Sequence, residues 1–140
     1  MNHQHTHHTQ VVVLALIQKG DTFLFTLRHD PGSDYHNKWQ IPGGGHEFGE
    51  TPIQTLHREV REELGVEVEI IQLLPDIQTK VRNTWQGIFL TYHCKLKDTD
   101  SPVVLNDEAS EYKWLTLEDL ANHDTLQSLD GCVELIKSLS

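Results

Sequence analysis

The sequence predicts a single α+β domain in which helices pack on a mixed β-sheet. Three observations lead to this prediction. The 140 residues are enough for one domain with a hydrophobic core. Short apolar or alternating runs, which are typical of strands, occupy much of the chain. A strongly capped helix interrupts them at residues 52–64, and a second amphipathic helix is expected at residues 131–139.

The first expected strand, at residues 10–18, is a continuous Val-rich apolar run that favours burial on both faces. The turn Lys19-Gly20-Asp21 joins it to a second strand at residues 22–28, so the two predict a hairpin. A polar loop and a short strand follow, and Pro42 with the three glycines after it ends that strand. The remaining elements are strands at 66–74, 84–97 (one long strand or a strand pair) and 111–115, and a capped helical turn at 116–120.

The helix at residues 52–64 has both a start and a stop signal. Thr51 is a good N-cap, Pro52 fits the first helical position, and Gln54 completes a capping box. Gly65 is expected to end the helix in the left-handed conformation. At about 100° per residue, the apolar stripe expected to face the sheet consists of Ile53, Leu56, Val60 and Leu64.

The acidic residues of this helix are distributed unevenly around it. A solvated acidic face would explain Glu62, because Arg58 lies four residues before it and can pair with it. Glu59 and Glu63 lie about 40° apart beside the apolar stripe, and like charges at this spacing destabilise a helix. A divalent cation would remove the conflict, and carboxylate oxygens suit Mg²⁺ or Mn²⁺. The pair therefore predicts a metal site.

Composition excludes several classes of function. The net charge of −10 argues against a nucleic acid polymer as partner, whereas a small anionic ligand could still bind through a metal ion. No apolar run is long enough to cross a membrane, and the His-rich lead does not resemble a secretory signal. We therefore expect a cytoplasmic protein without a membrane partner, with Cys94 and Cys132 as free thiols. Residues 1–9 are expected to be disordered and residues 10–140 to form the domain.

Residues 44–66 resemble the Nudix box in full. The matching positions, at the spacing of the family, are Gly44, Glu50, Arg58-Glu59-Val60, Glu62-Glu63 and Gly65-Val66. The flanking segments 39–44 and 111–120 are also similar to those of the family, so the resemblance covers roughly residues 10–139. It implies an α/β/α sandwich with the mixed sheet between helices. It also implies hydrolysis of a diphosphate linkage in a nucleoside diphosphate derivative, by attack of water on phosphorus.

The resemblance also implies roles for individual residues. Glu59 and Glu63 would be the main Mg²⁺ ligands, with Glu62 sharing metal or water. The carbonyl of Gly43 is a further candidate ligand, and the Gly43-Gly44-Gly45 run would let backbone approach a metal or phosphate closely, or would be a plain turn. The supporting residues would be Gly44, Glu50 and Arg58, with Arg58 pairing with Glu50 as an alternative to Glu62.

Two roles stay open. The general base is either a helix glutamate (Glu59 or Glu62) or a residue of a later loop, for which Glu108 is the first candidate and Glu111 the second. Arg28, at the end of the second strand, is either a bidentate phosphate ligand or a surface charge.

The substrate is less well defined by sequence. ADP-ribose hydrolases of the family tend to carry a proline where this chain has Val81, and dinucleoside polyphosphate hydrolases tend to carry a tyrosine near residues 82–84. The chain instead resembles the small MutT-like nucleoside triphosphate pyrophosphatases, which release a nucleoside monophosphate and pyrophosphate, and a homodimer is possible. The alternatives are hydrolysis of ADP-ribose, a dinucleoside polyphosphate or another nucleoside diphosphate derivative, a non-catalytic nucleotide-binding domain, or an isomerase. Tyr35, Trp85 and Phe89 either stack a base or pack locally.

Overall fold

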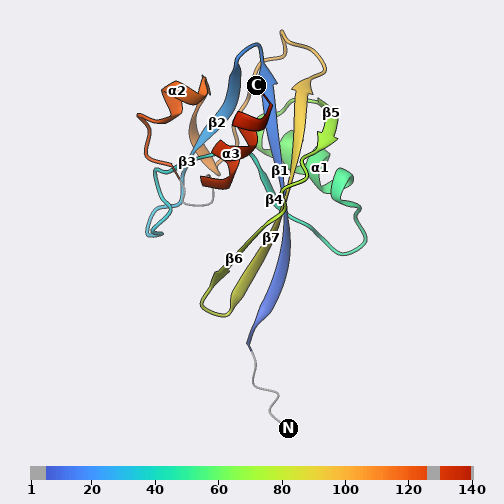
Figure 1. The fold of residues 1–140 in the computed structure, drawn as a ribbon, viewed down its shortest axis with the longest axis vertical. Coiled ribbons are helices and arrows are strands. Elements are labelled where there is room, and N and C mark those ends of the chain that lie inside the picture. The colour runs from blue at the N-terminus through green and yellow to red at the C-terminus, as the bar shows by residue number, and fades with distance from the viewer. Residues whose placement is uncertain (1–5, 126–129, 140) are drawn as a thin grey trace.

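The computed structural model describes residues 6–125 and 130–139, which form a mixed β-sheet covered by helices (Figure 1). The strands are β1 (His8–Lys19), β2 (Thr22–Arg28), β3 (Trp39–Gln40), β4 (Gly43–Gly45), β5 (Val68–Leu73), β6 (Gln78–Arg82), β7 (Trp85–Leu96) and β8 (Ala109–Leu115). The helices are α1 (Pro52–Leu64), α2 (Leu117–Leu120) and α3 (Asp130–Ser138). No helix in the described ranges is long and apolar enough to cross a membrane.

Strand β1 organises the sheet. It pairs in parallel with β7 over its whole apolar run, from His8 opposite Trp85 to Ile17 opposite Cys94. Its other edge pairs antiparallel with β4, and its end forms the expected hairpin with β2. Strands β3 and β8 then pair antiparallel with β2, while β5 and β6 pair antiparallel with β7. The sheet is therefore mixed, as predicted.

Apolar side chains fill both faces of this sheet. On one face, Val13, Ala15 and Ile17 of β1 belong to the same buried cluster as the apolar side chains of α1. On the other face, Leu16 belongs to a second cluster that reaches α2 and α3 through Leu120 and Ile136. Because successive residues of a strand point to opposite faces, the Val-rich run supplies both clusters. The predicted sandwich of helices on both faces of the sheet is confirmed.

Helix α1 has the predicted limits and caps. Thr51 and Gln54 form the capping box, and Gly65 ends the helix in the left-handed conformation at φ 64°. The apolar stripe differs in one position, because Ile53 is 46% exposed whereas Thr55 is fully buried. The buried face of the helix is thus rotated toward the flank that carries Glu59.

Several strand limits differ from the predicted ones. β1 begins at His8, so residues 8 and 9 belong to the sheet and not to a disordered lead, while residues 1–5 lie outside the described residues. The glycine run forms strand β4 and not merely a turn, because its backbone pairs with β1. Strand β6 was not predicted, and it pairs with the first half of β7. Cys94 is a buried free thiol whose pKa is raised to about 12 by burial, whereas the side chain of Cys132 lies outside the described set.

Candidate active site

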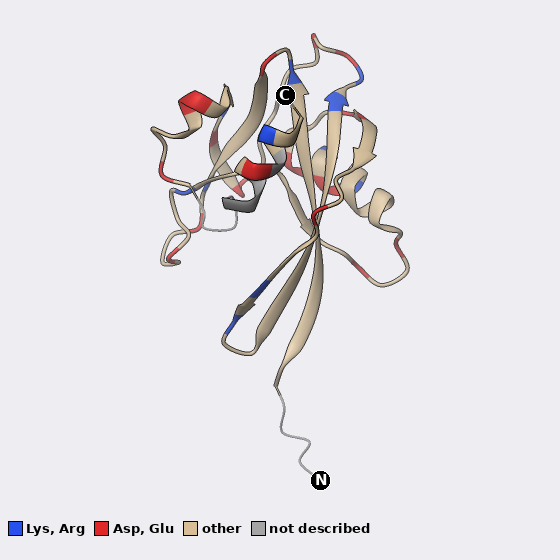
Figure 2. Ribbon diagram, viewed as in Figure 1, with Lys and Arg blue, Asp and Glu red and all other residues tan. Residues whose placement is uncertain are grey.

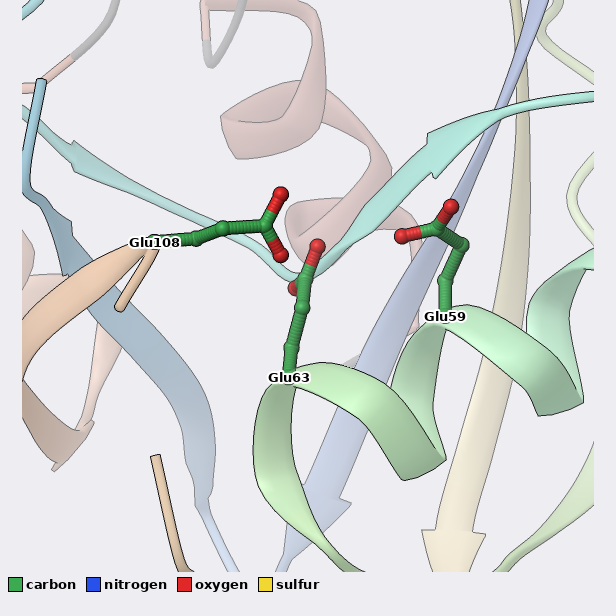
Figure 3. A group of neighbouring side chains, drawn as sticks. All are labelled: Glu59, Glu63 and Glu108. Atoms are coloured by element: carbon green, nitrogen blue, oxygen red, sulfur yellow. The ribbon is translucent and has the colours of Figure 1, made fainter. Parts of the chain in front are cut away.

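Three carboxylates converge beside strand β4. Glu59 and Glu63 rise from successive turns of α1, and Glu108 reaches them from the loop before β8 (Figure 3). One carboxylate oxygen from each residue lies within 4.8 Å of the others. The helix alone places Glu59 beside Glu63, but the position of Glu108 depends on how β8 pairs with the sheet.

The backbone of Glu108 is held by the residue that follows β2, and its side chain is held by a loop residue. Its carbonyl accepts a hydrogen bond of 2.9 Å from the N–H of His29, where β8 pairs with the end of β2. Asn106 Nδ2 donates to Glu108 Oε2 at 3.0 Å. Glu111, the second candidate for a loop glutamate, instead lies opposite Leu27 within the β2–β8 pair. The structure thus brings Glu108 to the helix glutamates and leaves Glu111 in a strand.

Burial and the repulsion of neighbouring carboxylates disfavour charge on the two helix glutamates. Burial raises the pKa of Glu63 to about 9, the nearby charge of Glu108 adds to the effect, and the N–H of Gly43, which donates to Glu63 Oε2 at 3.2 Å, opposes it. Burial also raises the pKa of Glu59, against the opposing effect of Arg58. Buried, closely spaced carboxylates either keep a proton or take up a cation. Three hard oxygen donors in one place fit Mg²⁺ or Mn²⁺.

Arg58 is the centre of the hydrogen bonds that hold this group. Its guanidinium binds Glu50 through two hydrogen bonds of 2.7 and 3.0 Å, and donates to Glu59 Oε1 at 2.7 Å. It also donates to the carbonyl of Gly45 at 3.2 Å. This bidentate pair holds the pKa of Glu50 at about 2. Both pairings considered for Arg58 are present, but the contact with Glu62 is long at 3.5 Å, and the Glu62 side chain is 55% exposed.

Two further residues support Glu50, and sequence reasoning missed both. The buried hydroxyl of Thr55 donates to Glu50 Oε1 at 2.9 Å, and His46 Nδ1 lies 2.9 Å from the same hydroxyl oxygen. The other partners of this hydroxyl, Glu50 and the carbonyl of Thr51 at 3.3 Å, are acceptors. The proton on Nδ1 of His46 is therefore assigned as the donor to Thr55. The burial of Thr55 could have been inferred from its place on the flank of Glu59, but no sequence pattern singles out His46.

The glycines of β4 let the carboxylates lie against the sheet. A Cβ on Gly44 would overlap the carboxyl group of Glu59, and one on Gly43 would overlap the carbonyl oxygen of Val13. Gly43 also has a φ of 149°, which other residues rarely adopt. The glycine run therefore does bring backbone close to its neighbours, and these neighbours are the carboxylate of Glu59 and strand β1.

These carboxylates line one end of a pocket of about 620 Å³. Its other lining residues include apolar side chains of β1, the aromatic side chains of Tyr35, Trp85 and Phe89, and three cations, Arg28, Lys80 and Arg82. Arg28 donates to Asp30 Oδ2 through two nitrogens at 3.2 and 3.3 Å, so it is already paired within the pocket. Glu62 is not among the described residues that line this pocket.

Comparisons with known proteins agree with this arrangement. The chain matches the NUDIX domain family over residues 6–133. Nucleoside triphosphatase NudI of Escherichia coli O17:K52:H18 is 31% identical over 125 residues, which cover 82% of this chain and 87% of NudI.

Two solved structures share the fold. The MutT protein of Methanosarcina mazei Go1 has a TM-score of 0.81 at 22% identity over 96% of each chain. The E. coli ORF135 protein has a TM-score of 0.79 at 21% identity over 96% of this chain and 92% of its own. The chain therefore belongs to the Nudix hydrolase family.

Proposed function

We propose that this chain hydrolyses a nucleoside triphosphate to a nucleoside monophosphate and pyrophosphate, with a divalent cation held by Glu59, Glu63 and Glu108. The observation that supports this most is the convergence of the three carboxylates at one end of a pocket that also carries aromatic and cationic side chains. The name of NudI, a nucleoside triphosphatase, favours this substrate class over other nucleoside diphosphate derivatives.

The donor set fits Mg²⁺, with Mn²⁺ as a possible substitute. Glu59 is buried and Glu63 is partly buried, and the pKa of each is raised first by this burial and then by the charge of neighbouring carboxylates. A bound cation of this kind neutralises charge that develops on phosphate oxygens and lowers the pKa of a water molecule. The carbonyl of Gly43, which borders the same pocket, and the carboxylate of Glu62 are further candidate ligands.

The chain's own residues position the ligands and accept a proton. Arg58 holds Glu59 in place and is itself held by Glu50, which Thr55 and, behind it, His46 support. The Glu59 carboxylate therefore has little freedom to turn away. In the proposed reaction, the water oxygen forms a bond to phosphorus, the bridging P–O bond breaks, and pyrophosphate leaves with the electron pair of that bond.

The water proton passes to a carboxylate, for which Glu108 is the first candidate. The side chain of Glu108 is exposed, so the proton can pass on to solvent. The hydrogen bond from Asn106 directs the Glu108 carboxylate toward the helix glutamates. Glu62 and Glu59 are the alternatives from α1. Arg28 is the candidate phosphate ligand, and binding there requires a phosphate to replace Asp30 as its partner.

The experiment is a product assay over a panel of nucleotides with Mg²⁺ or Mn²⁺. Phosphate and pyrophosphate are measured separately for nucleoside triphosphates, ADP-ribose and dinucleoside polyphosphates. We expect pyrophosphate from the triphosphates, and a loss of at least about 100-fold in Glu63→Gln, since even the residues behind a metal ligand cost 10–100-fold. Glu69→Gln is the matched control, because Glu69 lies on β5 in an exposed pair with Lys95.

Three outcomes would overturn parts of the proposal. Unchanged activity in Glu63→Gln would refute the metal-ligand assignment. Faster turnover of ADP-ribose or a dinucleoside polyphosphate would favour those substrates. No turnover of any nucleotide would favour a binding domain without activity.

A further inference from the structure

The pocket runs along β1, from the residues that pair with β4 beside the carboxylates to a basic arm in an otherwise acidic protein. The arm consists of β6, residues 85–89 of β7 and residues 8–12 of β1, which extend together from the body of the molecule (Figure 1). Residues 77–94 include Lys80 and Arg82 and no acidic residue, although the chain has 21 Asp and Glu. Figure 2 shows the two cations on β6 and no acidic residue on the arm. The arm is therefore the part of the pocket that attracts anions.

Arg82 is the cation of the arm that is best placed to bind an anion. Its guanidinium carbon lies 4.2 Å from the ring centroid of Tyr35 and 5.5 Å from that of Trp85, and it lines the pocket. Stacking on an aromatic ring fixes the plane of a guanidinium and leaves the N–H groups at its edge available. Tyr35, which belongs to the loop between β2 and β3, thus holds the arginine of the arm in a defined orientation.

Arg82 also differs from the other arginines in its partners. Within residues 6–125 and 130–139, each of the other arginines forms an ion pair: Arg28 with Asp30, Arg58 with Glu50 and Glu59, and Arg61 with Glu67. In the same ranges, Arg82 has neither a carboxylate partner nor a side-chain hydrogen bond. In a protein with a net charge of −10, an arginine without a carboxylate is available for an external anion.

We infer that Arg82, held by Tyr35, binds a phosphate of the substrate that lies away from the carboxylate cluster, which in a nucleoside triphosphate is the terminal phosphate. This inference rests on the proposed function and narrows its substrate class. A planar guanidinium matches two phosphate oxygens at once. A nucleoside diphosphate linked to a neutral sugar has no such phosphate to offer, so Arg82 favours triphosphates over that class.

The test uses Arg82→Gln and Arg82→Lys, with Lys95→Gln as the control. Lys95 lies on β7 in an exposed pair with Glu69, outside the residues that line the pocket. Binding of inorganic tripolyphosphate with Mg²⁺ is measured by calorimetry. Turnover is measured for a nucleoside triphosphate and for a nucleoside diphosphate sugar with the same base. Thermal unfolding confirms that the variants fold, as expected for an exposed side chain.

Arg82→Gln is expected to weaken tripolyphosphate binding by at least about 10-fold, as for a lost hydrogen bond to a charged group. We expect the same factor in kcat/KM for the triphosphate, chiefly through KM. The diphosphate sugar should be unaffected, Arg82→Lys should recover part of the loss, and Lys95→Gln should behave as wild type.

The inference and the proposed function fail in different ways. Wild-type affinity for tripolyphosphate in Arg82→Gln would refute the inference. Equal losses for the triphosphate and the diphosphate sugar would also refute it, because Arg82 would then contact the nucleoside diphosphate part that both share. Absence of triphosphate turnover in the wild type would refute the proposed function, while tripolyphosphate binding would still decide the role of Arg82.

Discussion

Replacing Glu63 with Gln is expected to stabilise the metal-free protein while it removes metal binding. Partial burial and the nearby charge of Glu108 raise the pKa of the Glu63 carboxyl from 4.5 to about 9. Between these two pH values the folded protein holds a proton that the unfolded chain releases, so stability falls as pH rises through this window. A glutamine has nearly the same shape, carries no charge, and its side-chain oxygen can still accept the hydrogen bond from the N–H of Gly43.

The size of the stability gain in Glu63→Gln follows from the same pKa shift of Glu63. At pH 7, which is 2.5 pH units above the ordinary value of 4.5, the penalty on wild type is at most about 3 kcal/mol. The partial exposure of the side chain places the measured value below this upper limit. At pH 4.5 and below, the advantage of Glu63→Gln should largely disappear, because Glu63 is protonated in both folded and unfolded wild type.

The assay is denaturant unfolding in a chelator, repeated with excess Mg²⁺ at each pH. Without metal, Glu63→Gln should be the more stable protein at pH 7. With Mg²⁺, wild type should gain stability through binding, and the variant should gain little. Glu69→Gln should follow wild type throughout, because Glu69 is exposed. An advantage of Glu63→Gln that is absent at pH 7, or unchanged down to pH 4.5, would refute the argument from buried charge.

The residues around the cluster allow three more predictions. Thr55→Val should lower the free energy of unfolding by about 1–3 kcal/mol, since it removes the buried hydroxyl that donates to Glu50; an unchanged urea midpoint would contradict this. Gly44→Ala should weaken Mg²⁺ binding at least about 10-fold, measured by calorimetry, because its Cβ displaces the Glu59 carboxyl; equal affinity would show that Glu59 can move freely. Arg58→Lys should cost about 1–3 kcal/mol in denaturant unfolding, because one ammonium cannot replace a bidentate pair and a third carboxylate contact; full stability would show that charge alone suffices.

Helix α1 could be predicted from sequence because its geometry is local. The capping box and the glycine after the last turn set its limits, and a helical repeat of 3.6 residues places Glu59 beside Glu63 whatever surrounds the helix. The spacing that resembles the Nudix box rests on the same regularity. The pair of glutamates that we propose to bind the cation could therefore be identified without tertiary information.

Strand β6 could not be predicted from its residues. Its residues, QTKVR, are exposed or only partly buried, and they lack the alternation of apolar and polar residues that predicts a half-buried strand. What makes it a strand is backbone pairing with β7, and side chains carry no record of that pairing. Because β6 was missed, the arm and the place of Arg82 in the pocket were missed as well.

By itself, the sequence determined the family, the capped helix and the pair of glutamates one turn apart, because each depends on residues close together in the chain. Only the tertiary structure places Glu108, and not Glu111, beside the helix glutamates, since their positions depend on the register of β8 against β2. It also decided that His46 and Thr55 lie behind Glu50, and that Tyr35 meets Arg82 across the pocket. These contacts join segments distant in sequence, and the packing of the whole sheet, not any local pattern, brings them together.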